Sequence, residues 1–159
     1  MSNMTVDQLS KQILSDLNKQ LLLNNFSLHK ALLLLEEGEK YAASINVPVV
    51  LTIIDGGGNL IAQHRMDQAL LASIEISKAK AYTALSLQKS TEELANVIQP
   101  GQSLYGLQDT CPGKFCFFGG GIPLYRNNMY IGAVGVSGGT VEQDTLIAKH
   151  MVSFFLRQE

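Results

Sequence analysis

Gly135, Ser137 and Gly139 form the pattern Gly-x-Ser-x-Gly between an apolar segment and the expected start of a helix. In α/β hydrolases this pattern positions a nucleophilic serine. A catalytic triad also needs an acid and a histidine, and only Asp144 and His150 fit that requirement later in the chain. They lie six positions apart on the helix that follows, so they point in different directions and cannot align with Ser137. We therefore interpret the pattern as a tight turn.

Residues 137–140 also leave backbone N–H groups at the N-terminus of the expected last helix. Free N–H groups and the helix dipole together attract carboxylates and phosphates. An anion site at Gly138, Gly139 and Thr140 is therefore one hypothesis, and it would suit a small enzyme acting on an organic acid or aldehyde. The simpler interpretation is structural, with Ser137 and the glycines in the turn and Thr140 as the helix cap.

His29, His64 and His150 are scattered along the chain and share no metal-binding spacing. Each could still bind a haem iron or another tetrapyrrole singly. His29 is the strongest candidate because Leu33, one helical turn later, places an apolar side chain beside it on the outer face of its helix. Met66 shares a strand face with His64, and a core position suits it better than a role as axial ligand.

Cys111 and Cys116 lack the second pair of ligands that a zinc site needs. We expect reduced thiols because the first residues do not resemble a signal peptide, although a thiolate could bind iron. No apolar run approaches the ~20 residues of a membrane span. The expected compartment is the cytoplasm.

The chain of 159 residues is 46% hydrophobic and only 16% charged, with a formal net charge of −2. This length suits a single domain. So few charges leave much apolar surface to cover, which indicates subunit interfaces and hence a homo-oligomer. The lack of a basic cluster disfavours nucleic acid and anionic membranes as partners.

A helix expected over residues 70–87 is rich in alanine and serine, and small side chains let a helix pack closely against a sheet. Its charged residues Glu75, Lys78 and Lys80 could line a pocket, but solvent-exposed charge is the simpler interpretation.

Two units are predicted along the chain. Residues 1–25 form a leading helix whose apolar residues share one face, at Val6, Leu9, Ile13 and Leu17. Residues 26–159 form one α+β domain. Because helices and strands do not alternate regularly, we expect a mostly antiparallel sheet of about five strands with helices on its faces. The expected helices are 27–45, 70–87, 90–98 and the segment from Thr140, and the expected strands are 47–55, 60–66, 115–118, 122–125 and 129–136.

Several segments resemble the domain shared by the GlcG and HbpS haem-binding proteins, the DUF336 family. They are residues 55–59 (DGGGN), 63–67 (QHRMD), 77–80 (SKAK), 118–123 (FGGGIP) and 131–144 (IGAVGVSGGTVEQD). The segment QPGQSLYGLQ at 99–108 resembles, more narrowly, the C-terminal domain of PduO-type cobalamin adenosyltransferases. The resemblance covers about residues 27–155. It does not include the adenosyltransferase domain of the PduO-type proteins.

The resemblance implies a profilin-like three-layer α/β/α sandwich with five antiparallel strands. It also implies self-association into dimers or octamers and, in some members, haem binding. The PduO relatives belong to B12-dependent diol or glycerol metabolism.

Three hypotheses follow. In the first, a cytoplasmic oligomer binds haem or a corrinoid in an accessory role in B12-dependent metabolism. The second is the small enzyme with the anion site, and the third is a structural partner of a dehydratase system without any ligand. The residues predicted to contact a ligand are His29, Leu33, Met66, Gly120, Gly121, Ser137, Gly138, Gly139 and Thr140, with His29 as the candidate iron ligand.

Overall fold

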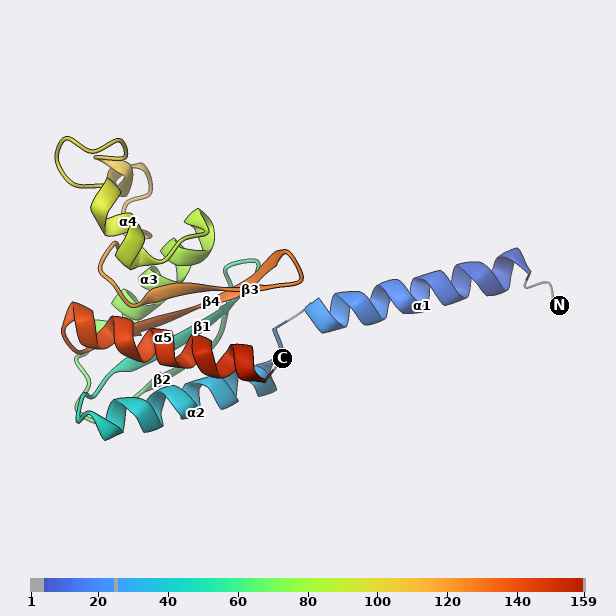
Figure 1. The fold of residues 1–159 in the computed structure, drawn as a ribbon, viewed down its shortest axis with the longest axis horizontal. Coiled ribbons are helices and arrows are strands. Elements are labelled where there is room, and N and C mark those ends of the chain that lie inside the picture. Colours follow the sequence, from blue (N-terminus) through green and yellow to red (C-terminus); the bar gives the residue numbers. More distant parts are fainter. Residues whose placement is uncertain (1–4, 25, 159) are drawn as a thin grey trace.

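The computed structural model describes residues 5–24 and 26–158, which form an α/β body and a leading helix (Figure 1). No helix in this described part is both long and apolar enough to cross a bilayer. The elements in chain order are α1 (Val6–Asn24), α2 (Leu28–Ser44), β1 (Val50–Asp55), β2 (Leu60–Arg65), α3 (Ser73–Leu87), α4 (Thr91–Val97), the 3-10 turn η1 (Leu107–Thr110), β3 (Gly121–Arg126), β4 (Met129–Ser137) and α5 (Val141–Arg157).

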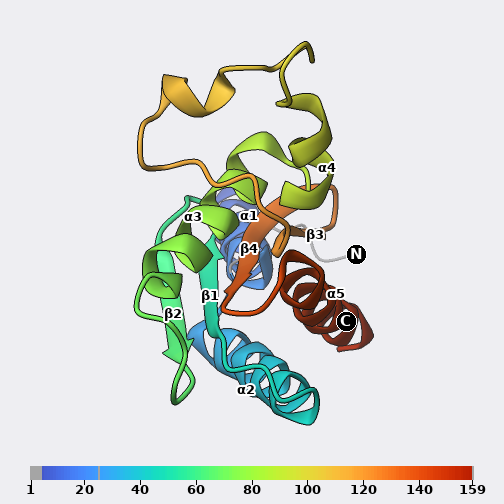
Figure 2. The same cartoon turned by 90° about the vertical axis from the view of Figure 1, so that its left-hand side faces the viewer.

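The strands form one sheet in the order β2-β1-β4-β3, and every neighbouring pair is antiparallel. Helices α2 and α5 cover one face of the sheet and α3 covers the other (Figures 1 and 2). Ile53 at the centre of β1 pairs with Ala62 of β2 and with Val134 of β4. The predicted mixed fold with an antiparallel sheet and helices on its faces is confirmed.

The sheet has four strands in the described residues, so the predicted count of five is wrong. The segment 115–118, which we expected to be a strand, lies outside the sheet. The backbone N–H of Cys116 donates to Oγ1 of Thr83 at 2.8 Å. This N–H is therefore bonded to a side chain of α3 and not to the backbone of a neighbouring strand. The ring of Phe115 packs against the rings of Tyr82 and Phe117. The apolar run at 115–118 therefore covers α3 and does not extend the sheet.

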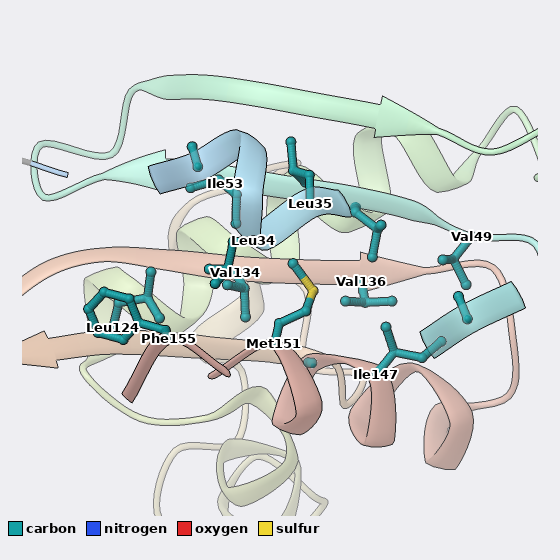
Figure 3. Close-up of a cluster of buried hydrophobic side chains, with 14 of the residues drawn as sticks. Leu34, Leu35, Val49, Ile53, Leu124, Val134, Val136, Ile147, Met151 and Phe155 are labelled. Atoms are coloured by element: carbon teal, nitrogen blue, oxygen red, sulfur yellow. The ribbon is translucent and has the colours of Figure 1, made fainter. Parts of the chain in front are cut away.

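The main hydrophobic core lies between the sheet and the pair of helices α2 and α5 (Figure 3). Burial of these apolar side chains is the main source of the free energy that stabilises this layer. The residues labelled in Figure 3 are Leu34, Leu35, Val49, Ile53, Leu124, Val134, Val136, Ile147, Met151 and Phe155.

The opposite face of the sheet meets α3 through small residues, as its composition predicted. Ala81 and Ala84 of α3 pack against Ile54 and Ala133 of the sheet. At Gly135 of β4 the helix comes so close that no side chain would fit. This close packing fixes α3 against the sheet.

Helix α1 lies apart from the α/β body (Figure 1). Its apolar residues Val6, Leu9, Ile13 and Leu17 are all exposed. Their spacing places them on one helical face, and in a single chain these four side chains remain 47–86% exposed.

In a chain kept dilute enough to stay monomeric, we therefore expect that deleting residues 1–25 changes the free energy of unfolding of the domain by less than about 1 kcal/mol. Urea unfolding of the full chain and of the chain starting at Phe26 measures the difference. Phe26→Ala in the full chain is the matched control, because this ring is 6% exposed and contacts Phe155, with 5.7 Å between ring centroids. Its loss should cost about 3–5 kcal/mol. A deletion that costs as much as Phe26→Ala would show that α1 is an integral part of the domain.

Candidate functional site

Two of the three histidines are held by glutamates of α2. Nδ1 of His64 lies 2.8 Å from Oε1 of Glu39. Nε2 of His150 lies 2.9 Å from Oε1 of Glu37, and the imidazole of His150 stacks on Tyr41 with 4.3 Å between ring centroids. Both rings therefore already have hydrogen-bonding partners that link α2 to the sheet or to α5.

His29 differs from them because its imidazole is exposed and has neither hydrogen bond nor ion pair to any residue that the structure describes. It lies in the first turn of α2, which begins after the cap residue Ser27. Oγ of Ser27 accepts a hydrogen bond from the N–H of Lys30 at 3.3 Å, so the start of the helix is fixed locally. The cap thus presents the ring of His29 at the surface on an ordered backbone.

His29 borders a groove of about 220 Å³ between the start of α2 and the end of α5. Leu33, one turn after His29, is 39% exposed although it is apolar. Phe154 and Phe155 form the opposite side of the groove, and Lys30 and Gln158 add polar groups. The groove therefore combines an available imidazole with an apolar surface, which is the combination that a tetrapyrrole ligand requires.

The remaining predicted residues lie elsewhere. Met66 packs against the main core and does not line the groove. Gly120 and Gly121 precede and begin β3, and residues 137–140 connect β4 to α5. These segments lie at the N-terminal end of α5, while the groove is at its C-terminal end, roughly 24 Å away for a helix of this length. The nine residues therefore do not form one site.

Just before α5, the backbone N–H groups of Gly139 and Thr140 are bonded within the protein. The N–H of Gly139 donates to Oδ1 of Asp144 at 2.9 Å, and the N–H of Thr140 donates to Oε1 of Gln143 at 2.9 Å. Thr140 also caps the helix by accepting a hydrogen bond from the N–H of Gln143. An external anion at this position would have to compete with the carboxylate of Asp144. The hydroxyl of Ser137, also predicted to contact a ligand, is likewise bonded within the protein, because its Oγ donates to Oγ of Ser73 at 3.2 Å.

A buried ion pair, which sequence reasoning missed, lies beside this turn. Nζ of Lys80 is 2.7 Å from Oδ2 of Asp144 and donates to the carbonyl oxygen of Val136 at 2.9 Å. The two charged side chains are 2% and 4% exposed, so the interpretation of Lys80 as solvent-exposed charge is wrong. Burial raises the pKa of the Asp144 carboxyl, while Lys80 and the N–H of Gly139 act in the opposite direction. The pair links α3 to α5 across the end of the sheet.

The spacing of α3 carried the signal for this burial. Lys80 follows the same three- and four-residue spacing as the small buried residues Ser73, Ser77, Ala81 and Ala84.

Gly120 and Gly121 make room for the pair. A Cβ at position 120 would lie 3.2 Å from Nζ of Lys80 and 2.7 Å from the carbonyl oxygen of Val136. At position 121 it would overlap the backbone of Lys80. The geometry therefore gives these glycines a packing role.

Potential metal ligands do not cluster in the part of the chain that the structure describes. Among the described residues, no group of three or more His, Cys, Asp or Glu side chains is placed to hold a metal ion. Cys111 and Cys116 are both free thiols, and burial raises the pKa of the Cys116 thiol.

Comparison with known proteins decides the family. The family model described as "Haem degrading protein HbpS-like" matches residues 26–153, which is most of the α/β body. The chain belongs to the HbpS-like family. The resemblance inferred from the sequence motifs is thereby confirmed.

Three relatives show how far the HbpS-like likeness extends. A 15.0 kDa protein encoded between dhaT and dhaS in Citrobacter freundii is 46% identical over 139 residues, which cover 87% of this chain and 98% of that protein. The corrinoid adenosyltransferase PduO of Salmonella typhimurium is 45% identical over 112 residues, 70% of this chain but only 33% of PduO. A solved complex of PduOC with haem is 41% identical and superposes with a TM-score of 0.79, covering 81% of this chain and 94% of that chain.

Proposed function

We propose that this HbpS-like chain binds haem in the groove between α2 and α5, with His29 as the ligand to the iron. The observation that carries the proposal is that His29 presents an imidazole with no partner among the described residues beside an apolar groove, whereas His64 and His150 are held by glutamates. The solved complex of PduOC with haem, at 41% identity, supports the choice of ligand.

The residues of the groove fit haem chemically. A neutral imidazole can bind iron through a ring nitrogen. Leu33 and Phe154 offer apolar contacts to a porphyrin face, while Lys30 and Gln158 provide polar groups near the groove. Haem, when bound, supplies a redox-active iron.

The size of the groove favours an oligomeric holoprotein. About 220 Å³ is less than the roughly 300–1,000 Å³ of pockets that enclose drug-sized ligands, so one chain covers only part of a porphyrin. A second copy of the chain would cover the other part. The low charge content and the exposed apolar face of α1 support a homo-oligomer, either a dimer or an octamer.

The metabolic role that we propose is accessory to B12-dependent diol or glycerol metabolism in the cytoplasm, with a dehydratase system as the partner. The likeness to PduO, a corrinoid adenosyltransferase, supports this context. The chain spans only a third of PduO, so the proposal does not include adenosyl transfer. A corrinoid is the alternative ligand for the same groove.

Titration of the purified chain with haem and, in parallel, with cobalamin tests the proposal. We expect haem to give a shifted Soret band that saturates at a fixed ratio to protein, and cobalamin to give no saturable change. His29→Ala should weaken haem binding by at least about tenfold, since loss of a ligand should cost no less than loss of a group supporting one. His64→Ala is the matched control, because this half-buried ring is bonded to Glu39 and lies outside the groove.

Two results would count against the proposal in different ways. An unchanged titration of His29→Ala would place the haem at another residue. No saturable Soret shift in the wild-type chain would remove haem binding altogether, and a saturable cobalamin spectrum would then favour the corrinoid.

A further inference from the structure

A second cleft, of about 210 Å³, lies on the α3 side of the sheet, opposite the layer that carries His29. It is bordered by α3, by the hairpin between β1 and β2, and by the end of the long loop that follows α4. Figure 2 shows that loop arching above α3 before the chain returns to the sheet. The haem proposal does not use this cleft.

The residues of α3 that line the cleft differ from those that the helix buries. Glu75, Lys78 and Tyr82 recur at spacings of three and four and line the cleft. The two charged residues are those that the sequence had already marked as possible pocket residues. Glu75 and Lys78 line the cleft and also keep the solvent exposure expected of their charge, while Lys80 of the same helix is buried in its ion pair.

Two lysines, Lys78 and Lys114, line the cleft. Nζ of Lys114 lies 5.8 Å from the centroid of the Tyr82 ring, and Nζ of Lys78 lies 2.9 Å from Oε2 of Glu75. The side chains of Lys78 and Glu75 are 45% and 75% exposed, so their mutual attraction is weak in water. Two lysines against one glutamate leave the cleft with a net positive charge, which favours an anion.

Glycines keep the space beside Tyr82 open. Gly58 at the hairpin and Gly113 in the loop both border the cleft, with φ of +81° and +76°. A Cβ at position 58 would lie 3.5 Å from the Tyr82 ring and would occupy part of the cleft. The positive φ values disfavour other residues at both positions. Leu60, half exposed although apolar, adds an apolar wall.

We propose that this cleft binds a small aromatic carboxylate. The flat apolar part of the ligand lies against Tyr82 and Leu60, and the carboxylate lies between Lys78 and Lys114. The volume of the cleft is below that of drug-sized pockets, which limits the ligand to a small molecule. The site is independent of His29 and of haem.

Benzoate is the probe, and its binding is followed by amide chemical shifts of the full chain in ¹H–¹⁵N spectra. We expect saturable shifts at Gly58, Tyr82, Gly113 and Lys114. Benzamide keeps the ring and loses the charge, and should bind at least about tenfold more weakly, a difference of about 1.4 kcal/mol. The double variant Lys78→Gln, Lys114→Gln should lose benzoate binding by a similar factor, and it should fold normally because both side chains are partly or fully exposed.

His29→Ala separates this site from the proposed haem site, and it should bind benzoate like the wild type. Benzoate shifts that are absent, that are equally strong with benzamide, or that persist in the lysine double variant would overturn the carboxylate site. A loss of benzoate binding in His29→Ala would place the ligand in the groove between α2 and α5 and would also overturn it.

Discussion

Replacing Gly135 with alanine should lower the free energy of unfolding by more than about 3 kcal/mol, at or beyond the upper end of overpacking effects. A Cβ at this position would overlap the carbonyl oxygen of Ser77 and would lie 2.8 Å from the amide nitrogen of Ala81. Both neighbours are backbone atoms of α3, so no side chain can rotate away to relieve the contact. The whole helix would have to move away from the sheet, and the contacts of Ala81 and Ala84 with Ile54 and Ala133 would open with it.

Urea unfolding of Gly135→Ala measures this cost, with Gly101→Ala as the matched control. Gly101 has a φ of +84°, but a Cβ at this position would have no atom within 4 Å, so only backbone strain of about 1–2 kcal/mol applies there. At Gly135 the φ angle is not positive, so backbone strain is absent, but a Cβ has no free space. A loss at Gly135 no larger than the loss at Gly101 would mean that α3 is not held tightly against β4.

Replacing Lys80 with alanine should cost about 3–5 kcal/mol, because Asp144 would remain buried without its counter-charge. The two side chains are 2% and 4% exposed, and Asp144 would keep only backbone N–H groups such as that of Gly139 as partners. Lys78→Ala is the matched control on the same helix. Its side chain is 45% exposed and its ion pair lies at the surface, so we expect a loss of about 0–1 kcal/mol.

The pH dependence of Lys80→Ala follows from the same burial. Burial raises the folded-state pKa of Asp144 above its ordinary value of 3.8, and removing Lys80 takes away an influence that lowers this pKa. The folded variant therefore binds a proton more tightly than the unfolded chain does. Its deficit relative to wild type should be largest at neutral pH and should shrink as the pH falls through the folded-state pKa towards 3.8.

Double replacement separates the charge from the packing. Lys80→Met with Asp144→Asn removes both charges while keeping similar volumes, and should recover part of the stability lost in Lys80→Ala. A deficit for Lys80→Ala that equals that of Lys78→Ala, or that does not change between neutral and acidic pH, would contradict a buried pair.

Local patterns in the sequence were sufficient to predict the layers of the fold. The alanine- and serine-rich composition of α3 predicted its close packing against the sheet. Because side chains alternate along a strand, neighbouring residues such as Gln63 and His64 of β2 lie on opposite faces of the sheet. In the structure the side-chain amide of Gln63 donates to Oγ1 of Thr52 and to the carbonyl oxygen of Ile74 in α3, whereas His64 bonds to Glu39 of α2. These features depend on residues that are close in the sequence. For such residues, the helical and strand periods determine the direction in which each side chain points.

Features that depend on distant residues could not be predicted in this way. Lys80 and Asp144 are 64 positions apart on helices that cover opposite faces of the sheet. The apolar segment 115–118 has the composition of a strand, and only its contact with Thr83 of α3 shows where its backbone bonds. His29 was singled out from its own helix, but the aromatic wall that faces it belongs to α5, and no local pattern links the two helices.

The most direct test of haem binding at His29 replaces this proposed iron ligand with a different one. A thiolate ligand gives haem a spectrum distinct from that of a histidine ligand, so His29→Cys and His64→Cys are each loaded with ferric haem and their absorption spectra are compared with that of the wild type. We expect a thiolate-type spectrum for His29→Cys and a wild-type spectrum for His64→Cys. A wild-type spectrum from His29→Cys at full haem occupancy would show that the iron is bound elsewhere.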